Sequence, residues 1–247
     1  MDTNPPKVEI AIESNNETSL LLDGLWFGRN FVMMMYRTNR SKVPIKVRFM
    51  KREYGSYIAE DLLEIKYMGY RFYGIVSDGG KGVRTGVNEV YKFKPHQICL
   101  AHVTRNAAKS IGKRSKEERI QELRRLIYDM WKIENEEALY YWYSKVLTWE
   151  KRNIQYLRER RYDNTGRKWF VHRGARKAIR LIKKSKDSSF KFTKYPLIPK
   201  TTNAIEGQFG QIVKKHIVHS GLKIERVPKF LTWYRYLYIE NLRADSK

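Results

Sequence analysis

Three apolar runs joined by short connections, followed by helical segments that alternate with single strands, constrain the fold of this chain more than any other feature. The runs SLLLDGLWF (19–27), FVMMMYR (31–37) and PIKVRFM (44–50) have the lengths and residue types of β-strands. A Gly-Arg-Asn turn signal at 28–30 separates the first two. Consecutive strands with such short connections suggest an antiparallel meander.

The pattern then changes to helices separated by single strands. Apolar residues have helical spacing over 56–68 and 81–91, whereas 71–78 has the pattern of a buried strand. A further short strand at 96–101 leads into a helix at 103–110. Three meander strands followed by strand–helix–strand crossovers predict an α/β fold with a mixed sheet.

Beyond Gly112 the chain is charged, aromatic and helical in pattern. Apolar residues recur at helical spacing in 115–147, and helical patterns return at 203–215 and 228–243. We therefore divide the chain into a polar lead-in (1–18), the first part of a core domain (19–112), a helical basic insertion (113–199) and C-terminal helices of the core (200–247).

The net charge of the chain indicates the class of partner. Its 247 residues include 50 Lys and Arg against 26 Asp and Glu, which gives +24 and points to a polyanion. Half of this excess, +12, lies in 151–191, where fifteen cations face three acids. We expect this stretch to contact the DNA backbone, although a solvated helix face is the alternative. The candidate DNA-binding residues are Arg173, Arg176, Lys177, Arg180, Lys183 and Lys184.

Cysteine content and hydropathy indicate where the protein acts. One cysteine excludes an intrachain disulfide framework and is consistent with a reducing compartment. No apolar run approaches the roughly 18 residues of a membrane span, and the N-terminus lacks a signal-peptide pattern. A basic membrane-surface protein is the alternative, but neither end shows the required amphipathic helix or lipidation signal. We expect a cytoplasmic, nucleoid-associated protein.

Two aspartates lie at strand positions suited to chemistry. Asp23 interrupts an apolar run, and Asp78 ends the strand at 71–78, directly before two glycines. If these two strands are parallel neighbours, both acids meet at one edge of the sheet, where their oxygen atoms would suit Mg²⁺. The structural alternatives are ion pairs with nearby cations and, for Asp78, a simple turn residue.

Glu206 is the natural third acid. It lies in TTNAIEGQFG at the start of a predicted helix, which Asn203 is placed to cap. If that helix packs on the sheet, its first turn points towards the two aspartates. Taken alone, an acid at the position of Glu206 more often lies on a helix surface.

Four blocks around these residues resemble the catalytic blocks of Mutator-type DDE transposases of prokaryotic insertion sequences. In order, they are LDGLWF, SDGGKGV, QICLAHVTRN and TTNAIEGQFGQIVKK, and together they cover roughly residues 19–215. The resemblance implies an RNase H-like mixed five-stranded sheet with flanking helices. It also implies an all-helical insertion before the last catalytic acid, and Glu206 follows Asp78 by 128 positions, which leaves room for one.

The resemblance further implies metal-dependent DNA strand cleavage and strand transfer by Asp23, Asp78 and Glu206. Such enzymes use two Mg²⁺ ions roughly 3.5–4 Å apart, for which Mn²⁺ can substitute, to activate water and to stabilise the leaving 3′-oxygen. Asp23 is the candidate to bridge both ions, and Asp78 and Glu206 each to complete one. We expect double-stranded DNA as the partner, both as element ends and as target, with homo-oligomerisation on the DNA left open.

Cys99 and His102 form the other local signal. A structural zinc site needs four ligands, and His216 and His219 lie ten or more residues beyond Glu206, about 15 Å along a helix. The resemblance suggests instead a recurrent pair beside the active site. His102, Arg105 and Asn106 are candidate phosphate contacts, whereas Cys99 is equally consistent with a small buried residue.

The chain departs from this family at its start. Only 22 residues precede Asp23, where the family usually has a sequence-reading DNA-binding region. We therefore expect a transposase catalytic core without that region. A second interpretation is a catalytically idle remnant that binds DNA non-specifically, and a third is an RNase H-like nuclease for structured nucleic acid.

Overall fold

The computed structural model describes residues 5–6, 18–112, 114–218 and 221–244. The chain forms two compact units by its internal contacts, and each unit has its own hydrophobic core. The first unit, here called the sheet unit, comprises Met1–Lys94 and Thr202–Lys247. The second, here called the helical unit, comprises Pro95–Thr201.

The sheet unit contains β1 (Ser19–Phe27), β2 (Phe31–Thr38), β3 (Lys46–Met50) and β4 (Gly74–Ser77), in the order β3-β2-β1-β4. The first three strands pair antiparallel, as the predicted meander requires. The strand β4 pairs parallel with β1, after the crossover helix α1 (Gly55–Tyr67). The prediction of a mixed α/β sheet is therefore confirmed.

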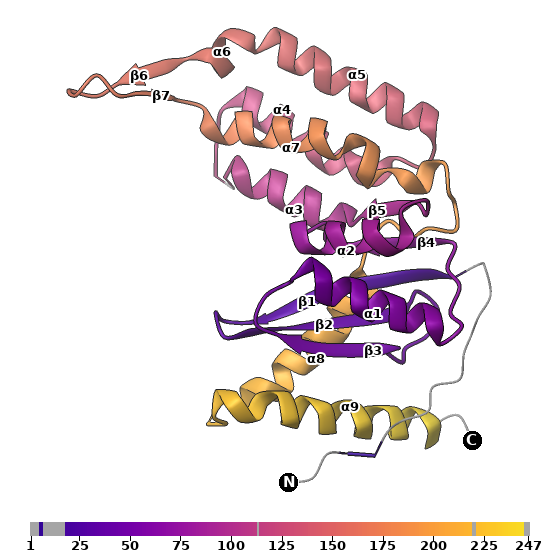
Figure 1. Cartoon of the computed structure of the whole chain (residues 1–247). Helices are drawn as coiled ribbons and strands as arrows, with labels where there is room; N and C mark the ends of the chain where they lie inside the picture. The colour runs from indigo at the N-terminus through magenta and orange to yellow at the C-terminus, as the bar shows by residue number, and fades with distance from the viewer. Residues whose placement is uncertain (1–4, 7–17, 113, 219–220, 245–247) are drawn as a thin grey trace. The chain divides into compact units, whose positions relative to one another are not determined.

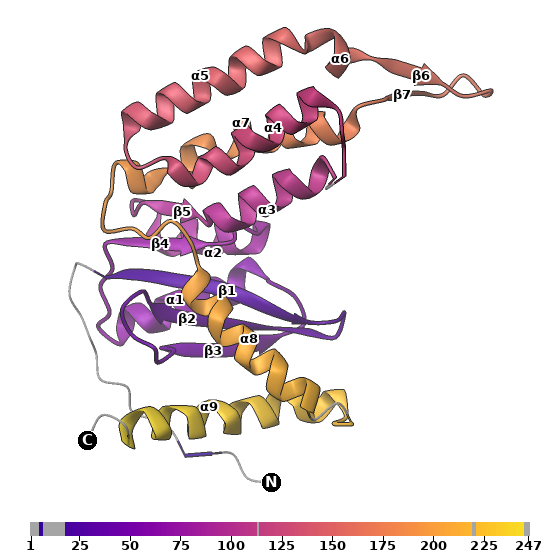
Figure 2. The same ribbon diagram turned by 180° about the vertical axis from the view of Figure 1, so that it is seen from behind.

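Helices cover both faces of this sheet. The helices α1 and α2 (Lys81–Tyr91) lie on one face (Figure 1), and α8 (Asn203–Val218) crosses the other (Figure 2). Leu20 and Leu22 of β1 share a core with Ile58 and Leu62 of α1. Because side chains alternate along a strand, Asp23 points to the opposite face, which α8 covers.

A buried ionic network joins α1 to the outer strands. Asp61 of α1 is fully buried, and the Tyr36 hydroxyl donates to its Oδ2 at 2.8 Å. Lys46 Nζ and Arg48 Nε lie 3.0 and 2.8 Å from Asp61 Oδ1. A buried carboxylate requires such partners, so the network fixes how α1 sits on β2 and β3.

The C-terminal part of the sheet unit continues through η3 (Ile224–Arg226) into α9 (Val227–Ala244). Arg235 of α9 donates to the Pro44 carbonyl oxygen at 3.2 Å. An apolar cavity of about 80 Å³ lies between β2, β3, α8 and α9, with Met33, Phe49 and Leu231 in its wall. None of the described helices is long and apolar enough to span a bilayer.

The helical unit begins with β5 (His96–Ile98) and α3 (Leu100–Ser110). Its remaining elements are α4 (Glu118–Asp129), η1 (Met130–Lys132), α5 (Glu136–Arg152), α6 (Ile154–Arg158), β6 (Arg160–Tyr162), β7 (Lys168–Phe170), α7 (Arg173–Ser189) and η2 (Lys191–Thr193). The core of the unit lies between α3, α4, α5 and α7 and includes Leu123, Trp142, Trp149 and Ile182.

The helical unit starts at Pro95, earlier than the boundary at 113 that we expected, and it ends at Thr201 rather than 199. Gln97 explains this start, because its Nε2 donates to the Ser189 carbonyl oxygen at 2.7 Å and its Oε1 accepts from Lys191 N at 2.8 Å. The contact of α3 with α7 is also close, since a methyl group on Gly174 would lie 2.3 Å from the Ser110 carbonyl oxygen.

The prediction of an all-helical insertion is wrong in one place. Residues 160–162 and 168–170 form an antiparallel hairpin, β6–β7. Asp163 and Gly166 explain its turn: Gly166 has φ +78° and donates from its N–H to the Asp163 carbonyl oxygen at 3.0 Å. We predicted helix throughout this stretch from its basic composition, without using the turn residues Asp163 and Gly166.

Candidate active site

The parallel pairing of β1 and β4 brings Asp23 and Asp78 to neighbouring positions. The last paired residues of the two strands are Leu22 and Ser77, and the two aspartates follow directly. Residues at matching positions of parallel strands point to the same face, so both carboxylates lie on one face of the sheet, where the pairing of β1 with β4 ends. Asp23 is buried, with 4% of its surface exposed, and Asp78 is half-buried.

Both carboxylate oxygens of Asp23 accept hydrogen bonds within the sheet unit. Gly24 N donates to Oδ1 at 2.9 Å, and the Thr202 hydroxyl donates to Oδ2 at 2.8 Å. Thr202 is fully buried and directly precedes α8. The start of α8 is therefore tied to Asp23 in the middle of β1. Arg37 of β2 adds a second tie, because its Nη1 donates to the Ala204 carbonyl oxygen at 3.1 Å.

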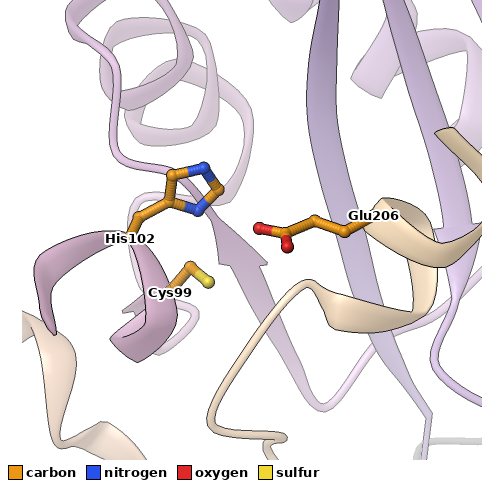
Figure 3. A group of neighbouring side chains, drawn as sticks. All are labelled: Cys99, His102 and Glu206. Carbon is orange, nitrogen blue, oxygen red and sulfur yellow. The ribbon is translucent and has the colours of Figure 1, made fainter. Parts of the chain in front are cut away.

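Glu206 lies in the first turn of α8 and is half-buried (Figure 3). Its N–H donates to the Thr202 carbonyl oxygen at 3.2 Å, which places Thr202 at the N-cap. Asn203, which we expected to cap the helix, is instead its exposed first residue. Because Thr202 and Glu206 are four residues apart, they lie on the same side of α8, the side from which Thr202 binds Asp23.

Glu53 is a further acid at this edge that the sequence analysis missed. Its Oε1 accepts a hydrogen bond from Trp26 Nε1 at 3.2 Å. A methyl group on Gly24 would lie 2.7 Å from Glu53 Oε1, and one on Gly80 would lie 2.9 Å from Glu53 Oε2. The glycines that follow the two aspartates therefore leave the space that the Glu53 carboxylate occupies. The sequence offered only a weak signal, an acid just before the helix at 56–68.

The pKa of Glu53 reflects the burial and the negative charge around it. Burial, then the charge of Asp78, and to a smaller extent that of Asp23, raise the pKa of Glu53 to about 7, against the opposing effect of the Trp26 hydrogen bond. Mutual repulsion of this kind raises a carboxyl pKa when several acids share one place. Negative charge is thus concentrated where the parallel pairing of β1 and β4 ends.

The remaining predicted near-site residues belong to the helical unit. Cys99 is buried and directly precedes α3, and half-buried His102 lies in its first turn (Figure 3). Arg105 and Asn106 are exposed on the same helix. Of the two histidines considered as further zinc ligands, His216 lies in the sheet unit with its ring 5.3 Å from that of Phe27. His219 lies outside the described residues.

The six predicted DNA-binding residues are all in α7 but have different surroundings. Five of them are exposed, and four of these five are spaced to share one helix face: Arg173, Lys177, Arg180 and Lys184. Arg176 instead donates to the Leu157 carbonyl oxygen at 2.8 Å. Lys183 forms an ion pair with Glu150 at 2.8 Å.

Comparison with known proteins identifies the family of the chain. The profile of the transposase IS66 family matches residues 28–215, well over half of the sequence, and this range includes Asp78 and Glu206. Among curated proteins, none matches the chain significantly. The resemblance to transposases is thus confirmed, but the Mutator-type assignment is not supported, because the matching profile is that of a different transposase family. The chain belongs to the IS66 family of transposases.

Proposed function

We propose that this protein is a metal-dependent DNA transposase whose sheet unit cleaves and joins DNA strands with Asp23, Asp78 and Glu206. One observation carries the proposal: Asp23 and Asp78 follow the last paired residues of two parallel strands, and the Thr202 hydrogen bond ties the start of α8 to Asp23. Three carboxylates on separate elements of one unit are the donor set that two-metal phosphoryl transfer requires.

The chemistry of these residues fits Mg²⁺. All three donors are carboxylates, which suit a hard cation, and the pKa of Glu53 is raised by its burial and then by the negative charges of Asp78 and Asp23. When bound, Mg²⁺ ions would supply an activated water and stabilisation of the leaving 3′-oxygen. The protein itself orients Asp23, since both of its oxygens are held by Gly24 N and the Thr202 hydroxyl.

DNA is the substrate that the family implies, and the charge of the chain supports it. The net charge of +24 favours a polyanion, and four exposed cations share one face of α7. Residue types of this kind bind phosphates without reading sequence. We assign the DNA backbone to this face of α7.

The deciding experiment is a Mg²⁺-dependent cleavage assay on DNA that carries the ends flanking the protein's own gene. Asp78→Asn removes one carboxylate with little change in shape, so cleavage should fall by at least a hundredfold while DNA affinity without metal is kept. Glu89→Gln, an exposed acid of α2, is the matched control and should cleave like wild type. Equal cleavage by wild type and Asp78→Asn would contradict the proposal.

DNA binding without catalysis is the second candidate, and the charge of the chain alone favours it. It predicts that wild type binds DNA with strong salt dependence but leaves the strands intact at every Mg²⁺ or Mn²⁺ concentration. Cleavage by wild type that Asp78→Asn abolishes would exclude this candidate.

A further inference from the structure

The β6–β7 hairpin extends away from the helices of the helical unit (Figure 1). All three residues of β6 and Lys168 of β7 are exposed. The residues from 158 to 168 carry five cations, Arg158, Arg160, Arg161, Arg167 and Lys168. Their two acids are engaged locally, Glu159 with His172 at 2.7 Å and Asp163 within the turn. The hairpin therefore presents mainly positive charge.

The register of the hairpin sorts its side chains onto two faces. Arg160 pairs with Phe170 and Tyr162 with Lys168, so these four share one face, and Arg161 lies on the other. The Arg160 guanidinium is 4.4 Å from the Phe170 ring centre, and Lys168 Nζ is 5.0 Å from that of Tyr162. Cation–π contacts of this kind hold the charged groups in place while leaving them able to meet phosphate.

The tip of the hairpin is built to be rigid. Asp163 Oδ1 accepts from the N–H of Thr165 and of Arg167, both at 2.9 Å, and from the Thr165 hydroxyl at 2.6 Å. These bonds hold the pKa of Asp163 below its ordinary value. Like any aspartate that is not buried, Asp163 is ionised at neutral pH, so all three hydrogen bonds have a charged acceptor. A rigid hairpin pays little ordering entropy when it binds.

The base of the hairpin is fixed to the helices beside it. The Arg176 guanidinium lies 3.5 Å from the Phe170 ring centre and also donates to the Leu157 carbonyl oxygen. The ring of His172 stacks on that of Tyr156 at 3.4 Å. Arg176, one of the residues predicted to bind DNA, thus has a structural partner at the point where the hairpin leaves the unit.

We propose that the β6–β7 hairpin enters the major groove of duplex DNA and is a principal DNA-binding element of this transposase. The inference rests on the proposed function for its choice of DNA as partner. The major groove of undistorted duplex DNA, about 12 Å wide, admits a two-stranded ribbon, whereas the minor groove, about 6 Å wide, must be widened before a ribbon can enter. Four cations on the exposed ribbon, together with Arg158 at the end of α6, match the phosphates that line the groove walls.

Two measurements test this assignment on the full chain. The first is the salt dependence of binding to duplex DNA, compared between wild type and the triple variant Arg160→Gln, Arg161→Gln, Lys168→Gln. Loss of three phosphate contacts should flatten the slope of log K against log salt by about 2.7. A matched triple variant of exposed sheet-unit lysines, Lys66→Gln, Lys92→Gln, Lys94→Gln, removes the same charge and should keep the slope within about one unit of wild type.

The second measurement is protection of guanine N7, an atom of the major groove, from methylation by dimethyl sulfate. Wild type should protect guanines, and the hairpin triple variant should lose that protection. An unchanged slope or unchanged N7 protection would overturn the proposal. Displacement by a minor-groove ligand, or equal competition by single-stranded DNA, would also overturn it. The Asp78→Asn variant should protect N7 like wild type even though it does not cleave. A failure of the proposed catalytic function can therefore be distinguished from a failure of the hairpin assignment.

The turn supplies a test that keeps every cation. Asp163→Ala removes a negative charge, which by electrostatics alone would strengthen binding, but it also removes the three hydrogen bonds that close the tip. We expect it to weaken DNA binding about three- to tenfold. Asp163→Asn keeps an acceptor and loses the same charge, so it should bind at least as well as wild type. Stronger binding by Asp163→Ala than by wild type would show that the rigid turn contributes nothing.

Discussion

Thr202 Oγ1 donates a 2.8 Å hydrogen bond to Asp23 Oδ2, and so joins two residues that lie 179 positions apart in the chain. Both partners are buried. The bond makes the orientation of an acid in β1 depend on the start of α8, the helix that carries Glu206. The helical unit, inserted between these segments in sequence, leaves the tie intact because the chain returns to the sheet unit at Thr202.

The variant Thr202→Val should distinguish the contribution of this hydrogen bond from that of side-chain packing. Valine fills the same space but offers no donor, and a buried hydrogen bond to a charged group contributes about 1.5–3 kcal/mol. We expect the free energy of unfolding, measured in urea without metal, to fall by that amount and strand cleavage to fall at least tenfold. Thr202→Ser keeps the hydroxyl and should retain most of the cleavage. Equal cleavage by the serine and valine variants would show that the bond has no role in the site.

The pH dependence of stability should report Glu53. Its pKa is raised from 4.5 to about 7 in the folded protein, so between these values the folded state binds more protons than the unfolded chain. The free energy of unfolding therefore falls as the pH rises through this window, because Glu53 must ionise where it is partly buried and beside Asp78. Glu53→Gln removes this loss.

The measurement is urea unfolding of the metal-free protein at pH 5 and pH 8. We expect the difference between the two pH values to be smaller in Glu53→Gln than in wild type, by an amount on the order of 1–3 kcal/mol. Glu89→Gln, in an exposed position, should follow wild type. Parallel pH profiles for wild type and Glu53→Gln would place the Glu53 carboxyl away from the other two acids.

Gly80 and Glu53 should be energetically coupled. A methyl group on Gly80 would lie 2.9 Å from Glu53 Oε2 and 3.5 Å from Asp78 Oδ1, so Gly80→Ala should destabilise the fold by about 1–3 kcal/mol. Adding Glu53→Ala opens that space and should restore most of the loss. A methyl group on Gly24 would also meet Val32 Cγ2 at 2.9 Å and Met34 Sδ at 3.0 Å, so the same rescue should fail for Gly24→Ala.

Denaturant unfolding of these single and double variants gives the coupling energy directly. A Gly80→Ala loss that is identical with and without Glu53 would mean that another neighbour opposes the methyl group.

The exposed face of α7 should contribute to DNA affinity independently of the hairpin. The variant Arg173→Gln, Lys177→Gln, Arg180→Gln, Lys184→Gln removes four exposed cations from one helix face. If each contacts a phosphate, the slope of log K against log salt should flatten by about 3.6. Lys183 has Glu150 as a partner, so Lys183→Gln alone should change the slope by much less than one unit. A quadruple variant with the wild-type slope would show that this face points to solvent.

Local patterns in the sequence determined the order and type of most elements. Apolar alternation and short connections predicted β1, β2 and β3, and helical spacing predicted α1, α2 and α8 within a few residues of their observed bounds. The placement of Asp23 and Asp78 on adjacent parallel strands also followed from the sequence. A strand that comes back after one crossover helix pairs naturally beside the first strand of the meander.

Only the tertiary structure decided which side chains meet. Glu53 joins the acidic edge because glycines at 24 and 80 leave room for its carboxylate, and such clearance between distant segments has no periodic signal. Arg176 and Lys183 could not be told from their neighbours in the basic stretch, yet the fold gives each a protein partner. The β6–β7 turn depends on a few hydrogen bonds around Asp163. The sequence on either side of the turn is highly charged and has helical spacing, so it predicted helix instead. Sequence periodicity reports the faces of elements, but contacts between elements arise only when the chain is packed.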